Sequence, residues 1–182
     1  MALVDSILST DSLEGITRRI GRFFTCFTGI ELTACDFMYA KRFTDKRKLH
    51  TASRLIEGEE QGVYVFIVDK KHCLKVGFAG TKSQARWNSH HYNLDNSTPS
   101  TLPKSILHDS EKFIGFMSDT SISNEAQNFV DILHGNNTSA IRSWLEEYTS
   151  RMEFKFSADK PKFAGTFLES SLHFMLNPLF EG

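Results

Sequence analysis

The sequence predicts an α+β domain in which helices flank a small antiparallel or mixed β-sheet. Three observations support this class: strand-like runs at 62–68 and 73–77 joined by four polar residues, an alternating run at 151–156, and apolar residues at helical spacing elsewhere. With 182 residues the chain is long enough for one domain with a full core, and its 40% hydrophobic content is typical of a globular protein. A disordered, collagen-like or coiled-coil chain is excluded.

The first predicted element is a helix over 11–28, whose apolar residues fall on one side and which Gly29 ends. Residues 1–60 are expected to form a helical, locally basic extension. Between 40 and 50, five Lys or Arg residues and a histidine stand within eleven positions. Such a run is either a solvated surface or a set of phosphate contacts. On the second interpretation, the candidate DNA-binding residues are Lys41, Arg42, Lys46, Arg47 and Lys48.

A β-hairpin is predicted next, at 62–77. Its β-branched and aromatic residues on either side of a polar connection indicate two antiparallel strands. The expected pairing places Tyr64 opposite Gly77 and Phe66 opposite Lys75, so that all four residues share one face of the hairpin. Tyr64 then lies diagonal to Lys75. A slip of one residue would move these two side chains to opposite faces.

Beyond the hairpin, apolar spacing and turn residues indicate a further series of elements. We expect helices at 81–92, 102–108, 124–133, 139–150 and 162–176, and strands at 112–117 and 151–156. In the first of these helices, Arg86 and His90 stand four residues apart and therefore share a face. His91 is expected on the surface of that helix, and Lys104 is a further candidate phosphate contact.

The sequence shows no feature of a membrane or secreted protein. It contains no run of about 18 apolar residues that could span a bilayer. Acidic residues stand near the N-terminus where a signal peptide needs basic ones, so we expect a cytoplasmic protein. The three cysteines, Cys26, Cys35 and Cys73, share no metal-ligand spacing, which favours a reducing compartment and argues against a zinc site.

The hairpin and the residues after it resemble the GIY-YIG nuclease family. Gly62-Val63-Tyr64 matches the first signature of the family. Lys75-Val76-Gly77 matches the second signature with lysine in place of its tyrosine, a variation among restriction-type members. Arg86 and His90 match the arginine and the histidine that follow the second signature.

Near the C-terminus, the segment around Glu169 resembles the part of the family that carries its metal-binding glutamate. The resemblance covers roughly residues 61–92 and 163–182, and it rests on five elements in the order of the family. It implies a catalytic domain over 61–182 with an insertion around 93–160.

The resemblance implies a metal-dependent endonuclease that hydrolyses DNA phosphodiester bonds, in first place a site-specific type II restriction-like enzyme. Glu169 would hold Mg²⁺ or Mn²⁺, Arg86 would contact the phosphate, and Tyr64 would orient or deprotonate the attacking water. Lys75 would supply a cation that favours the Tyr64 phenolate. His90 would accept a proton onward from Tyr64 or bond a phosphate oxygen. A single carboxylate suits magnesium, because this ion keeps most of its waters.

Two alternative functions stay open. One is a nuclease of repair, mobile elements or anti-phage defence that acts on single-stranded or branched DNA. The other is a catalytically inactive DNA-binding module, which is suggested by Lys75 and by Glu181 at the position of the family's terminal asparagine. For the restriction-like enzyme we expect double-stranded DNA as the partner and no membrane. We also expect a homodimer or higher homo-oligomer on DNA, because two strands need two active sites.

Overall fold

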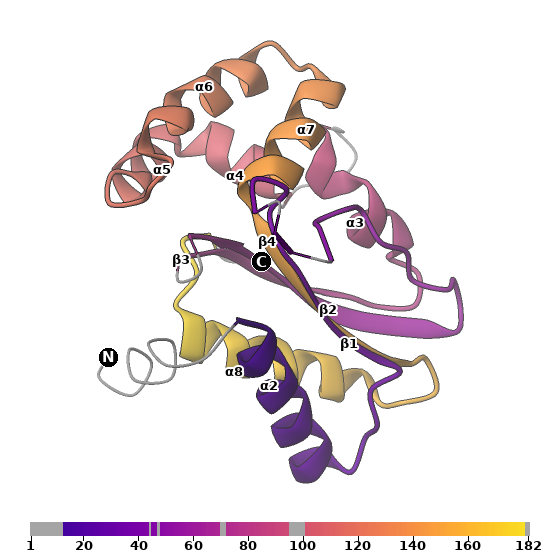
Figure 1. Ribbon diagram of the computed structural model, residues 1–182. Helices are drawn as coiled ribbons and strands as arrows, with labels where there is room; N and C mark the ends of the chain where they lie inside the picture. The colour runs from indigo at the N-terminus through magenta and orange to yellow at the C-terminus, as the bar shows by residue number, and fades with distance from the viewer. Residues whose placement is uncertain (1–12, 44, 47, 70–71, 95–100, 181–182) are drawn as a thin grey trace.

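The structure, a computed structural model, describes residues 13–43, 45–46, 48–69, 72–94 and 101–180. A four-stranded antiparallel sheet forms its middle layer, and helices cover both faces of the sheet (Figure 1). The strands are β1 (Ala34–Met38), β2 (Glu60–Val68), β3 (His72–Ala79) and β4 (Ser150–Ser157), in the spatial order β1-β4-β2-β3. The predicted α+β class is confirmed.

The helices divide between the two faces of the sheet (Figure 1). One face carries α2 (Leu13–Thr28) and α8 (Lys162–Leu176). The other face carries α3 (Gln84–Asn88), the short 3₁₀ turn η1 (His90–Tyr92), α4 (Leu102–His108), α5 (Ser110–Met117), α6 (Ser123–His134) and α7 (Thr138–Tyr148). None of the helices that the structure describes is long and apolar enough to cross a membrane.

Side chains alternate between two cores along β2. Val63 and Val65 belong to the core beneath α2 and α8, whereas Tyr64 and Phe66 belong to the core beneath α3–α7. All four side chains are fully buried. Because successive side chains of a strand point to opposite faces, burial on both faces makes β2 an almost continuous apolar run. This burial fixes Tyr64 in the interior of the protein.

The predicted register of the hairpin is confirmed around Tyr64. Tyr64 lies opposite Gly77, and Phe66 lies opposite Lys75. An irregularity directly after Phe66 shifts the register by one residue toward the turn. The shift occurs beyond the positions that matter for the site, so Tyr64 and Lys75 share a face of the sheet as expected.

Two predicted elements are corrected by the structure. The strand expected at 112–117 is wrong, because these residues lie in α5. Phe113 and Met117 both point into the core, and their spacing of four residues belongs to a helix rather than a strand. The helix expected at 81–92 is interrupted: α3 ends at Asn88 and η1 follows it.

The segments that were predicted as an extension and an insertion both contribute strands to the sheet. β1 belongs to the extension at 1–60, and each of its residues pairs with β4. β4 belongs to the insertion at 93–160 and lies between β1 and β2. The described parts of both segments therefore fold with the hairpin around one common sheet.

Arg151 on β4 is a fully buried cation. Its Nε lies 2.8 Å from Oε1 of Glu153, its Nη1 donates a hydrogen bond of 2.6 Å to the Tyr92 hydroxyl, and its Nη2 donates one of 3.1 Å to the Trp87 carbonyl. The guanidinium also packs against the rings of four aromatic residues: Tyr64, Phe66, Trp87 and Tyr92. These contacts tie β4 to α3 and η1.

Replacing Arg151 by methionine should lower the free energy of unfolding by about 3–5 kcal/mol, because the buried Glu153 loses its nearest cationic partner. The double variant Arg151→Met/Glu153→Gln removes both charges and should recover part of this loss. Urea unfolding of both variants beside the wild-type chain measures the difference. Equal stabilities of the single and double variants would contradict the pairing argument.

Candidate functional site

Four of the five predicted catalytic residues lie within electrostatic reach of one another. Tyr64 comes from β2, Lys75 from β3, Arg86 from α3 and Glu169 from α8. Arg86 donates a side-chain hydrogen bond to the Tyr64 hydroxyl. The charges of Arg86 and Glu169 both act on Lys75. Residues that are more than a hundred positions apart in the sequence thus come close together in the fold.

Glu169 reaches this cluster because β3 is the edge strand of the sheet. Its Oε1 accepts a hydrogen bond of 2.9 Å from the Phe78 amide. One helical turn earlier, Gly165 allows α8 to approach β3, since a Cβ there would lie 2.2 Å from the Phe78 ring. The backbone of β3 therefore sets the position of the carboxylate.

The Tyr64 ring occupies the space that the missing side chain of Gly77 leaves open. A Cβ on Gly77 would lie 2.3 Å from the Tyr64 hydroxyl oxygen. The edges of the ring are enclosed by Trp87 and His91, whose ring centroids lie 5.6 and 4.7 Å from that of Tyr64. Glycine is required opposite Tyr64 because of this close approach.

His91 is the histidine that contacts Tyr64, and its predicted surface position is wrong. It is fully buried, and its Nε2 lies 2.6 Å from the Tyr64 hydroxyl oxygen. The Leu102 amide donates to Nδ1 at 3.1 Å, so the proton of the neutral ring is on Nε2 and is donated to Tyr64. Burial, together with the nearby Arg151 charge, holds the pKa of His91 well below its ordinary value. The ring is therefore neutral at physiological pH.

His90, the predicted catalytic histidine, is half-buried on η1 next to His91. Because α3 ends at Asn88, the spacing of four residues no longer places Arg86 and His90 on one helix face. The sequence offered one signal for His91, its position directly after the histidine that matches the family motif. Periodicity alone gave no reason to turn it inward.

Burial sets the protonation of Tyr64 and Lys75, which are both 0% exposed. Burial raises the pKa of Tyr64 and outweighs the opposite effects of Arg86 and Arg151. Tyr64 is therefore a neutral phenol at neutral pH, against the expectation of a favoured phenolate. Burial and the Arg86 charge lower the pKa of Lys75 to about 8, partly offset by Glu169. Lys75 thus changes its charge close to physiological pH.

Glu169 is the carboxylate that the candidate site offers to the divalent metal expected from the sequence. In the part of the chain that the structure describes, no group of three or more His, Cys, Asp or Glu side chains is arranged to hold a metal. Mg²⁺ is commonly bound by one or two carboxylates together with waters and phosphate oxygens. One carboxylate oriented by the Phe78 amide meets this requirement when a phosphate supplies further oxygens.

The described basic side chains of the run at 41–48 form ion pairs. Each of its four described basic residues pairs with a carboxylate: Lys41 with Glu146, Arg42 with Asp69, Lys46 with Asp45, and Lys48 with Asp36. These carboxylates offset the positive charge that the sequence suggested for phosphate contacts. Lys104 lies half-buried on α4. The predictions for Arg47 and Glu181 concern positions outside the described residues.

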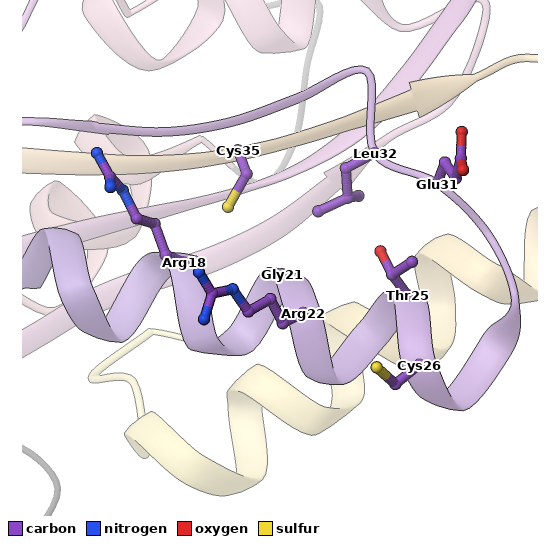
Figure 2. Close-up of a pocket in the computed structure, with 8 residues that line it drawn as sticks. All are labelled: Arg18, Gly21, Arg22, Thr25, Cys26, Glu31, Leu32 and Cys35. Carbon is purple, nitrogen blue, oxygen red and sulfur yellow. The ribbon is translucent and has the colours of Figure 1, made fainter.

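A separate cavity of about 420 Å³ lies between α2 and β1 (Figure 2). It is on the face of the sheet opposite to the Tyr64 side chain. Figure 2 shows Cys35 pointing from the sheet toward α2 near Gly21. Its thiol donates a hydrogen bond of 3.3 Å to the Thr17 carbonyl. Burial raises the pKa of Cys35 to about 11, so that the sulfur stays protonated and supplies neither a nucleophile nor a metal ligand at neutral pH.

The variant Gly77→Ala should be destabilised by about 1–3 kcal/mol, because its methyl group enters the space of the enclosed Tyr64 ring. Gly115→Ala is the matched control. Nothing lies within 4 Å of a Cβ at this exposed position of α5, and alanine there should stabilise the helix by up to about 1 kcal/mol. Urea unfolding measures both changes. Wild-type stability of Gly77→Ala would contradict the described packing.

No protein-family model, no curated protein and no solved structure matches this chain. The resemblance to the GIY-YIG nucleases therefore stays a prediction from the sequence. The electrostatic proximity of Tyr64, Lys75, Arg86 and Glu169, which come from four separate elements, is the basis on which a function can be proposed.

Proposed function

We propose that this chain is a metal-dependent endonuclease that hydrolyses DNA phosphodiester bonds, in first place a site-specific type II restriction-like enzyme. The supporting observation is the cluster of Tyr64, Lys75, Arg86 and Glu169, which come from four separate elements. Hydrolysis of a phosphodiester needs an oriented water, relief of the phosphate charge and stabilisation of the leaving oxygen. A hydroxyl, two basic side chains and a carboxylate are suited to these tasks.

Arg86 and Glu169 are half-buried and form the accessible part of the cluster. In the proposed mechanism, the Arg86 guanidinium donates hydrogen bonds to the phosphate oxygens and offsets their charge. Glu169, oriented by the Phe78 amide, would hold the divalent ion. A bound Mg²⁺ would polarise the phosphate and lower the pKa of a coordinated water.

Tyr64 and Lys75 are fully buried, and the Arg86 charge acts on both. Tyr64, as a neutral phenol held by the N–H of His91, orients the attacking water by a hydrogen bond. Lys75, with its pKa of about 8, has a neutral amine in a fraction of molecules at neutral pH and accepts the proton of the water. Because both residues are fully buried, the phosphate must first draw Arg86 away from the Tyr64 hydroxyl.

The proposed substrate is double-stranded DNA, and a homodimer would supply one site for each strand. A catalytically inactive DNA-binding module is the second candidate function. The complete burial of Tyr64 and Lys75 favours it, because neither side chain meets solvent in this conformation. A nuclease of repair or defence would use the same cluster on single-stranded or branched DNA.

The purified chain should cut plasmid DNA into discrete fragments with Mg²⁺ and leave it intact with a chelator. Glu169→Ala should lose the metal site, and Tyr64→Phe should lose the hydrogen bond that orients the water, so that each cuts at least about 10²-fold more slowly. Glu111→Ala on the exposed surface of α5 and the half-buried Tyr148→Phe are matched controls and should cut at the wild-type rate. Gel analysis of the time course measures all rates.

The form of the products decides between the candidate functions. Discrete fragments support the restriction-like enzyme. A metal-dependent smear, or cleavage of single strands alone, would assign the chain to repair or defence. DNA binding without cleavage by the wild-type chain would contradict the enzyme and leave the binding module.

The cleavage rate should rise as the pH increases through about 8, because loss of its proton turns Lys75 from a cation into a base. The matched variant Lys75→Arg keeps its charge throughout this range and should be inactive at every pH. The pH profile of kcat/KM, measured well below saturating DNA so that it reports the pKa of the chain without substrate, tests this effect. A rate that instead falls above pH 8 would give Lys75 the role of a cation beside Tyr64.

A further inference from the structure

We propose that a cavity beside Arg86 binds a backbone phosphate of DNA, next to the phosphate held by Arg86 and Glu169. This inference rests on the proposed function and adds a second contact to the substrate. The cavity has a volume of about 550 Å³ and lies where β3 and β4 end. Its ten described lining residues include four cations, Lys82, Arg86, Lys160 and Lys162, and no carboxylate.

The topology of the sheet brings these cations together. β3 and β4 both run antiparallel to β2, so their carboxyl ends lie at the same end of the sheet. β2 begins at this end, and the Gln61 amide group donates hydrogen bonds of 3.2 and 2.9 Å to the carbonyls of Ser157 and Lys160. On the other side, the Ser83 amide donates to the Gly80 carbonyl at 2.9 Å. Hydrogen bonds to backbone carbonyls thus hold both loops that form the cavity.

The charge of the cavity favours an anion. Lys82 and Lys162 are exposed, and within the described part of the chain neither forms an ion pair with a carboxylate. Lys160 pairs with the exposed Asp159 at 3.2 Å, which offsets one of the charges. Lys162 is also the first residue of α8, and the amino end of a helix of this length adds partial positive charge.

Arg86 connects the cavity to the proposed catalytic cluster. It lines the cavity and also donates a hydrogen bond to Tyr64. A guanidinium has five N–H donors, so that it can contact two neighbouring phosphates. A DNA strand that follows the cavity would therefore pass Arg86 and reach Glu169. The cavity meets the need for phosphate contacts better than the basic run at 41–48, whose described cations are all ion-paired.

Binding of a short duplex oligonucleotide to the full chain, in chelator so that cleavage does not compete, tests this site. For duplex DNA, each lost phosphate contact should reduce the slope of log Kd against log salt by about 0.9, measured from about 50 to about 200 mM. Lys82→Glu and Lys162→Glu should each reduce the slope by at least this amount. Arg22→Glu, exposed on α2 and not part of the cavity lining, reverses the same charge and should keep the wild-type slope.

Unchanged slopes in both lysine variants, or a wild-type chain that does not bind the oligonucleotide, would overturn the proposal. Saturable binding of inorganic phosphate that leaves the affinity for the oligonucleotide unchanged would assign the cavity to a small anion and overturn it as well. Reduced slopes in a chain that cuts nothing with Mg²⁺ would support the cavity while contradicting the proposed catalysis. The two proposals therefore fail in distinguishable ways.

Discussion

A guanidinium with no exposed surface must find its polar partners inside the protein, and Arg151 finds them on three elements at once. Glu153 pairs with it on β4, the Trp87 carbonyl accepts from it at the end of α3, and the Tyr92 hydroxyl accepts from it on η1. Losing any of these partners would leave part of a buried charge uncompensated. The segment between Trp87 and Tyr92 is therefore held against the sheet at both of its ends.

The geometry of the candidate site depends on these contacts of Arg151. Arg86 and His91 each stand one residue away from an anchor of Arg151, so the two donors to the Tyr64 hydroxyl are positioned by β4. Gly77 completes the arrangement from the other side because only a residue without a side chain leaves room for the Tyr64 ring. A strand within the predicted insertion is consequently part of the framework of the site.

The sequence predicted those features that depend on neighbours along the chain. The β-branched and aromatic residues and the polar connection predicted the hairpin and the pairing of Tyr64 with Gly77, because the length of the connection sets the strand register. The inward position of His91 could not be predicted in this way. It depends on the end of α3 at Asn88 and on an amide of Leu102, which a helical wheel does not include. The strand expected at 112–117 failed because its apolar residues also fit a helical period.

The role of the charged residues was harder to predict from the sequence than the fold. The basic run at 41–48 is conspicuous in the chain, but the fold places Asp36, Asp69 and Glu146 against it. Lys82 and Lys162 stand eighty positions apart and form no visible run, yet the parallel course of β3 and β4 brings them to one cavity. Local charge density thus says little about where phosphate binds when ion-pair partners come from distant segments.

The burial of Tyr64 and Lys75 couples substrate binding to the chemistry that we propose. The phenol and the amine are both kept from water, and this burial together with the Arg86 charge keeps the pKa of Lys75 low. A phosphate competes for Arg86 with a full negative charge, whereas the phenol offers only a neutral oxygen. Movement of the guanidinium toward the phosphate would expose the Tyr64 phenol and the Lys75 amine once a substrate is bound. In such an arrangement the base meets water only beside the bond to be cut.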